Sequence, residues 1–256
     1  MKIRLSPLFA LFALAACVAC TKRPVQPGFA IQSVDSLLHG EGFDCRIEYR
    51  FASIGNAAGH PALETIERAN IGYFYDLEAF EGTAAEAAEA AIAQIAEQYA
   101  MPPGASGPDV GTGRPAWEGE ISVESEGNVV DSLLCYAITR SSYTGGAHGM
   151  YSTQYHIYSL ADGFELSLAD LFDARQLEIL DRAIREKIAE TYDAVSDEDL
   201  SDRGFFPEYI CPTENFRITP EGIAFFYNPY EIGCYALGSV EVTFTWAELD
   251  ARFAAQ

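Results

Sequence analysis

Basic residues are scarce in this 256-residue chain: 16 Lys and Arg stand against 38 Asp and Glu, a formal net charge of −22. A surface so acidic repels phosphate backbones, which argues against nucleic acid as a partner. Past residue 20 no apolar run reaches the length needed to cross a bilayer. Disorder of the whole chain is excluded too, because 49% of the residues are hydrophobic and 16 Phe and 14 Tyr can fill a core.

The sequence also lacks the short motifs that carry much of enzyme chemistry. It has four His residues and no HExxH, GxGxxG, Walker loop or GxSxG segment. Asp197, Asp199 and Asp202 fail the spacing of a calcium loop, since Asp202 occupies the place of the required Gly. No Cys or His pair has the spacing of zinc ligands. We therefore expect a protein that is not an enzyme and has no catalytic residues, no metal site and no cofactor.

The N-terminus has the features of a bacterial export signal. Lys2 and Arg4 precede an apolar stretch over residues 5–16, which is too short to span a bilayer. The stretch ends in small residues followed at once by Cys17, and this junction resembles a lipobox. The resemblance implies that Cys17 is diacylated, becomes the mature N-terminus and ties the protein to a membrane.

Two alternatives remain for this terminus. Cys20 is a second candidate for lipidation, and an ordinary signal peptide cleaved near Ala19 would leave both thiols unmodified. Neither Cys is followed by Asp, a pattern that in Gram-negative lipoproteins indicates the outer membrane. We expect a signal peptide over residues 1–16, a tether over residues 17–29 and a body in the cell envelope, lipid-anchored at the outer membrane and facing the periplasm.

Four more cysteines follow in the body of the chain, namely Cys45, Cys135, Cys211 and Cys234. An even number in an exported chain predicts two disulfides, for which three pairings exist. We favour Cys211–Cys234, which would clamp the ends of one local hairpin region, and by elimination Cys45–Cys135. Each bridge could stabilise the fold by about 3 kcal/mol.

Hydrophobic periodicity predicts strands and helices interspersed along the chain. Strand patterns cover residues 45–51, 120–125, 129–139, 150–160, 164–166, 216–218, 223–227 and 240–244. Helical spacing covers residues 61–78, 84–100, 167–192 and a short stretch after Thr245. Capping boxes begin at Thr83 and Thr245.

Turn signals organise these elements into antiparallel pairs. We expect turns at residues 127–128, 162–163 and 219–222, and an acidic loop at residues 196–202. The segment 101–115 contains four Pro and four Gly and predicts a boundary between two halves. The fold class is therefore α+β, with mainly antiparallel sheets, packed helices and two small subdomains.

Three segments in order, residues 143–149, 162–172 and 216–238, resemble the DUF3298 family. The resemblance implies a DUF3298-like domain over residues 126–256. Residues 30–125 resemble the DUF4163 domain that usually accompanies it, mainly in the order of strand and helix and around Asn70. Together these domains form the extracellular part of RsiV-type anti-sigma factors, which bind lysozyme. Since this chain shows neither their transmembrane helix nor their sigma-binding segment, we expect no direct anti-sigma signalling.

Two loops supply the candidate binding residues. The candidates in the first loop are Tyr143, Gly145, Gly146 and His148, and those in the second loop are Tyr227, Tyr230, Glu231 and Tyr235. Glycines let a backbone approach a ligand closely, and Tyr offers a large contact area at small entropic cost. His148 suits a binding loop, but a His that hydrogen-bonds a tight turn is the favoured interpretation. The tyrosines suit a binding loop and a cap on the core equally well. His156 is expected to be a plain strand-face residue.

The leading interpretation is a non-enzymatic cell-envelope lipoprotein that binds a partner. Lysozyme, another envelope hydrolase or a wall component is the partner that the resemblance implies, and the acidic charge would speed the encounter with a basic protein. The first alternative is an enzyme acting on peptidoglycan or another glycan, which needs a cleft with two carboxylates. The second is a structural envelope lipoprotein without a discrete ligand. Two loops that meet on one exposed face would favour binding.

Overall fold

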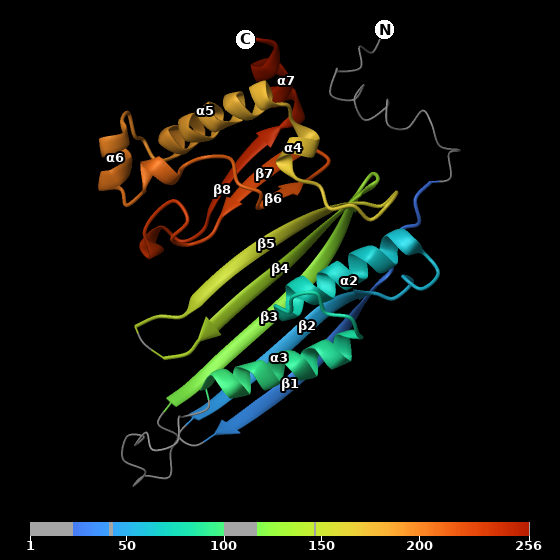
Figure 1. The fold of residues 1–256 in the computed structure, drawn as a ribbon. Coiled ribbons are helices and arrows are strands. Elements are labelled where there is room, and N and C mark those ends of the chain that lie inside the picture. Colours follow the sequence, from blue (N-terminus) through green and yellow to red (C-terminus); the bar gives the residue numbers. More distant parts are fainter. Residues whose placement is uncertain (1–22, 41–42, 100–116, 146, 256) are drawn as a thin grey trace.

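The structure, a computed structural model, describes residues 23–40, 43–99, 117–145 and 147–255. In these ranges the chain forms a five-stranded sheet, a three-stranded sheet and the helices that pack on them (Figure 1). The predicted α+β class with two sheet subdomains is confirmed. Cys17, Cys20 and Gly146 lie outside the described residues. No helix within the described ranges is long and apolar enough to cross a membrane.

The first sheet has the strand order β1-β2-β3-β4-β5. Its strands are β1 (Phe29–Gly40), β2 (Phe43–Ile54), β3 (Trp117–Val130), β4 (Leu133–Tyr143) and β5 (Met150–Ser159). Neighbouring strands run antiparallel except β2 and β3, which are parallel. The connection between β2 and β3 contains α2 (Pro61–Tyr75) and α3 (Ala84–Tyr99), and a crossover of this length is what a parallel pair requires.

Helices α2 and α3 lie on the same face of this sheet (Figure 1). The capping box predicted at Thr83 is confirmed: its backbone N donates to the Glu86 carboxylate (2.8 Å), and its hydroxyl accepts from the Glu86 backbone N (3.3 Å). The fully buried side of α3 consists of alanines, whereas Ile92 and Ile95 pack at the margin of the core.

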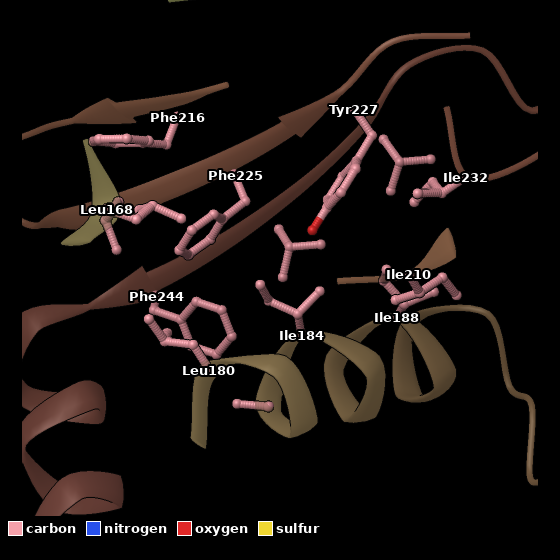
Figure 2. Packing of buried hydrophobic residues seen from close by; sticks show 14 of the residues in the cluster. Leu168, Leu180, Ile184, Ile188, Ile210, Phe216, Phe225, Tyr227, Ile232 and Phe244 are labelled. Carbon is pink, nitrogen blue, oxygen red and sulfur yellow. The ribbon is translucent and has the colours of Figure 1, made fainter. Parts of the chain in front are cut away.

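The second sheet is antiparallel and comprises β6 (Phe216–Ile218), β7 (Gly222–Tyr227) and β8 (Val240–Thr245). The predicted turn between β6 and β7 is confirmed by reciprocal backbone hydrogen bonds between Thr219 and Gly222. Helix α5 (Ala174–Thr191) covers this sheet and directs Leu180 and Ile184 toward the strands, as Figure 2 shows. The remaining helices are α4 (Leu168–Leu171), α6 (Asp197–Asp202), η2 (Pro207–Tyr209), η3 (Tyr235–Leu237) and α7 (Trp246–Ala254).

The turn predicted at residues 127–128 is wrong. The chain reverses at residues 131–132 instead, where Asp131 takes a left-handed conformation with φ 55°. Gly127 stays within β3, and the ring of Phe29 occupies the space that a Cβ at this position would need. The glycine therefore accommodates a neighbouring ring on β1 and does not make a turn.

Two predictions in the helical part also need correction. The helix expected over residues 167–192 is divided into α4 and α5, because Asp173 forms a new capping box with Gln176. The acidic segment expected as a loop forms α6, whose first turn is capped by the Ser196 hydroxyl through the backbone N of Asp199. Carboxylates in the first turn of this helix are favourable because they face the positive end of its dipole.

The predicted boundary at residues 125–126 falls inside β3, so the first sheet continues through it. The hydrophobic core divides by sheet face instead. Tyr136 of β4 belongs to the cluster under α2 and α3, whereas Cys135 of β4 and Ile157 of β5 belong to the cluster formed with the second sheet. Because side chains alternate along a strand, one sheet contributes to both cores.

The register of the strands explains why the predicted Cys45–Cys135 disulfide is wrong. Cys45 pairs in register with Gly119 and Cys135 with Asn128, positions roughly 30 Å apart along β3 at 3.3 Å per residue. Bridged cysteines have Cα atoms within about 7 Å. All four described cysteines are free, so Cys211 and Cys234 are not bonded to each other either. Burial raises the pKa of the Cys135 thiol to about 11, which leaves it unreactive.

Candidate functional site

β5 forms one edge of the first sheet, and two asparagines hydrogen-bond the backbone groups along that edge. Asn228 accepts from Thr153 N (2.7 Å) and donates to Thr153 O (3.1 Å). Asn215 accepts from Tyr155 N (2.9 Å) and donates to Thr153 O (2.9 Å). These amides occupy sites where another strand would pair. Asn228 holds the loop that follows β7 against β5, and Asn215 holds the start of β6 there.

The loops after β4 and after β7 meet at the start of β5. The ring of His148 stacks on Tyr235 with centroids 3.9 Å apart and planes 18° apart. The Tyr235 hydroxyl donates to Gly149 O (2.8 Å), and His148 Nδ1 lies 2.9 Å from the same carbonyl, which it reaches as a donor. The rings of Tyr230 and Tyr151 lie 5.7 and 6.0 Å from that of Tyr235. We call His148, Tyr151, Tyr230 and Tyr235 the aromatic patch.

The aromatic patch faces solvent. Tyr230 is 49% exposed, Tyr151 is 40% exposed, and Tyr143 and Met150 are each 45% exposed beside them. The patch is also held in an unfavourable backbone conformation, because Tyr230 has φ 74°, which costs a bulky residue about 1–3 kcal/mol. A strained, exposed aromatic side chain in a clamped loop is more typical of a binding surface than of a loop that only connects two strands.

Some of the residues in the predicted binding set lie together in the structure. It brings His148, Tyr230 and Tyr235 together, with Tyr143 at the edge of the same surface. The ring of His148 hydrogen-bonds its own turn, as the favoured interpretation expects, and also lies in the exposed patch. Gly145 has φ 90°, so its place in the loop depends on glycine.

Two predicted binding residues belong to the scaffold instead. Tyr227 is 2% exposed, its hydroxyl donates to Cys211 O (2.7 Å), and burial raises its pKa. Glu231 accepts from the backbone N (2.8 Å) and side chain (3.1 Å) of Asn228, so it shapes the loop that carries Tyr230. Tyr151 is a patch residue that the sequence pattern does not single out, because it lies in an alternating strand.

Comparison with known proteins agrees with the resemblance in the C-terminal part. Residues 169–247 match the family described as "Protein of unknown function (DUF3298)". These residues form a DUF3298 domain. The DUF3298 domain contains the loop of Tyr230 and Tyr235, whereas His148 and Tyr151 precede it. The aromatic patch therefore joins the domain to the sheet before it.

Two solved structures share the fold across most of the chain. A DUF3298 family member from Bacteroides fragilis has a TM-score of 0.75 and 24% identity, over 88% of this chain and 93% of its own. A DUF3298 family protein from Pseudomonas aeruginosa has a TM-score of 0.57 and 17% identity, over 89% of this chain and 94% of its own. At these identities the likeness shows the fold alone. No curated protein matches the chain.

Proposed function

We propose that this protein is an exported, lipid-anchored, non-enzymatic protein of the cell envelope that binds a basic protein partner through the aromatic patch. The observation that carries the proposal is the meeting of the two loops, with His148 stacked on Tyr235 and Tyr230 beside them. Rings that are already stacked and hydrogen-bonded lose little freedom when a partner binds, so more of the contact energy appears as affinity.

The chemistry of the patch suits a cationic partner. Arg and Lys side chains bind over the faces of tyrosine rings, and Tyr is enriched among the residues that dominate protein interfaces. The net charge of −22 would steer a basic protein toward this chain and speed association. Lysozyme is the first candidate, because the RsiV-type anti-sigma factors that the sequence resembles bind it. A wall component is the alternative ligand for the same patch.

The remaining parts of the proposal concern the N-terminal half. Residues 30–125 would be a DUF4163-like region, and Cys17, or alternatively Cys20, would carry the lipid, with the outer membrane as the location. Mass spectrometry of protein isolated from membranes tests the anchor directly. A diacylated N-terminal cysteine is the expected result, and an unprocessed leader would overturn this part of the proposal.

Isothermal titration of the chain with lysozyme, at low and at physiological salt, tests the binding itself. We expect binding that weakens as salt rises, and a loss of about 20-fold or more for Tyr230→Ala. The matched control is Tyr209→Ala, because Tyr209 is 61% exposed but lies in η2, outside the aromatic patch. Absence of binding at low salt, or equal loss in both variants, would overturn the proposal.

A further inference from the structure

A recess lies at the far end of β5, against α2. It has a volume of about 560 Å³ and is lined by Thr65 and Ala69 of α2 and by Tyr158, Asp162, Phe164 and Glu165 of the strand end and the turn that follows. Main-chain hydrogen bonds from Ser159 N to Phe164 O and from Gly163 N to Ser159 O (2.8 Å each) fix this turn, and an isolated bridge pairs Tyr158 with Glu165. We call this recess the α2 cleft.

The Glu165 carboxylate is held in the α2 cleft by both of its oxygens. Oε2 accepts from the Tyr73 hydroxyl (2.8 Å), and Oε1 lies 2.7 Å from His156 Nδ1, whose ring stacks on Tyr73 with centroids 4.0 Å apart. Burial raises the pKa of Glu165, but the hydrogen bonds from His156 and Tyr73 outweigh burial and hold the pKa below its usual value. The carboxylate is therefore ionised at neutral pH, and each oxygen keeps a lone pair for another donor.

Tyr158 provides the observation that points to a ligand. Its side chain is 1% exposed, and its hydroxyl has no hydrogen-bond partner among the described residues. The Nε2 atom of the neighbouring His156 is likewise without a partner in the described part of the chain. An unsatisfied buried polar atom is costly, so native proteins rarely keep one without a use for it.

The outer wall of the α2 cleft is apolar. Phe164 is 57% exposed, although a large aromatic side chain at a turn would ordinarily be placed against the core. Asp162 precedes it and directs one carboxylate oxygen to the backbone N of Phe164 (3.1 Å). The cleft thus combines an exposed aromatic ring, two carboxylates and an unpartnered phenol.

We propose that the α2 cleft binds a pyranose ring of a saccharide. The hydroxyl groups of a sugar donate to carboxylates such as Glu165 and Asp162 and exchange hydrogen bonds with a phenol such as Tyr158, while the apolar face of the ring packs on Phe164. A phosphorylated ligand would be repelled by the two carboxylates. Within the described residues, no group of three His, Cys, Asp or Glu side chains is placed to hold a metal ion.

Titration of the full chain with soluble trisaccharides, followed by NMR chemical shifts, tests this site. The two probes are a trimer of N-acetylglucosamine and a trimer of glucose. Comparing them distinguishes a site that requires the acetamido group from a site that recognises only the sugar ring. We expect at least one trimer to bind. Phe164→Ala should weaken that binding by about tenfold and Tyr158→Phe by about fivefold.

Tyr158→Phe also separates a binding role from a structural one. Removing a hydroxyl that has no partner should leave the melting temperature unchanged or raise it, so weaker binding could not be attributed to unfolding. The matched control is Tyr136→Phe, because the Tyr136 hydroxyl bonds Ser125 Oγ (2.7 Å) and Ala52 O (3.0 Å). The control should lower the melting temperature and leave sugar binding unchanged.

The sugar site does not depend on the partner proposed for the aromatic patch. Tyr230→Ala should therefore weaken lysozyme binding about 20-fold or more and leave saccharide binding intact. The proposal for the α2 cleft is overturned if neither trimer binds at millimolar concentrations, or if Tyr158→Phe and Phe164→Ala bind sugar as tightly as the unaltered chain.

Discussion

The two ends of β5 use similar residues in opposite ways. At its start, the rings of the aromatic patch are stacked and exposed to solvent, and the loop that carries Tyr230 and Tyr235 is hydrogen-bonded to the strand through Asn228. At its end, Tyr158 and His156 are packed under α2 with polar atoms that have no partner among the described residues. A rigid exposed surface suits a large partner, whereas a recess with unsatisfied groups suits a small polar molecule. The hydrogen bonds from Asn215 and Asn228 fix the middle of β5, between the aromatic patch at one end and the α2 cleft at the other.

Asn228→Ala should have the largest effect, because it removes the side-chain hydrogen bonds that hold the loop of Tyr230 and Tyr235 to β5. The substitution leaves the backbone N of Thr153 without its partner and removes the side-chain hydrogen bond that Asn228 donates to Glu231, so we expect a loss of about 3 kcal/mol in unfolding free energy, measured in urea. Lysozyme binding should fall with it. The control is Asn128→Ala, at an exposed position of β3, which should change stability by less than about 0.5 kcal/mol. Equal effects of the two substitutions would contradict this role of Asn228.

Gly163→Ala should destabilise the turn that follows β5, beside the α2 cleft. Gly163 has φ 79°, and a Cβ there would lie 2.6 Å from the backbone O of Ala62 in α2. Gly59 also has φ 79° but has no atom within 4 Å of the Cβ position, so Gly59→Ala isolates the cost of the conformation, about 1 kcal/mol. We expect Gly163→Ala to cost about 2 kcal/mol more than this control in urea unfolding. Equal losses of unfolding free energy for the two substitutions would show that the turn at Gly163 is not in close contact with α2.

Tyr230→Gly should separate stability from binding at the aromatic end. Glycine relieves the left-handed strain at this position, so we expect the unfolding free energy to rise by about 0.5–1 kcal/mol while lysozyme binding is lost. Tyr209→Gly, in η2, lacks that strain and should lower stability. Thermal unfolding of both variants provides the comparison, and a destabilised Tyr230→Gly variant would show that its conformation is not strained.

The smallest expected effects are opposite pH dependences at Glu67 and Glu165. Burial raises the pKa of Glu67 above its usual 4.5, and hydrogen bonds from Ser53 and Ile54 offset only part of this increase. Folding therefore takes up protons at this site, and the stability that the site contributes falls as the pH rises above 4.5. The pKa of Glu165 is lowered, so its contribution is present above 4.5 and is lost as pH falls below that value. Glu67→Gln should flatten the first slope and Glu165→Gln the second. Urea unfolding between pH 3 and 7 measures both, and slopes of the same sign would contradict the assignment.

Local signals in the sequence were sufficient for much of the fold. The caps at Thr83 and Thr245 and the turn from Thr219 to Gly222 depend on residues three apart, and all appear as predicted. Two failures were local, since the caps at Asp173 and at Ser196 each depend on a residue three positions further along the chain. The other failures depended on distant residues. The pairing of Cys45 with Cys135 requires the register of three strands, and Gly127 is needed because of a ring on β1.

The candidate site was predictable only in outline. The loops of His148 and Tyr235 stand out by composition, but their contact is made across 87 residues by hydrogen bonds and stacking that no local pattern encodes. Tyr227 and Tyr230 look alike in sequence, and only the end of β7 decides that the first is buried and the second exposed. The site around Glu165 could not be predicted from the sequence, because its partner Tyr73 lies in α2, 92 residues away along the chain.

Hydrogen–deuterium exchange of the full chain, alone and with excess lysozyme at low salt, tests whether a partner binds at the aromatic patch. We expect protection concentrated at residues 143–151 and 228–236, where the two loops of the aromatic patch meet, with the α2 cleft unchanged. Protection elsewhere, with these two segments unaffected, would show that the partner does not bind there.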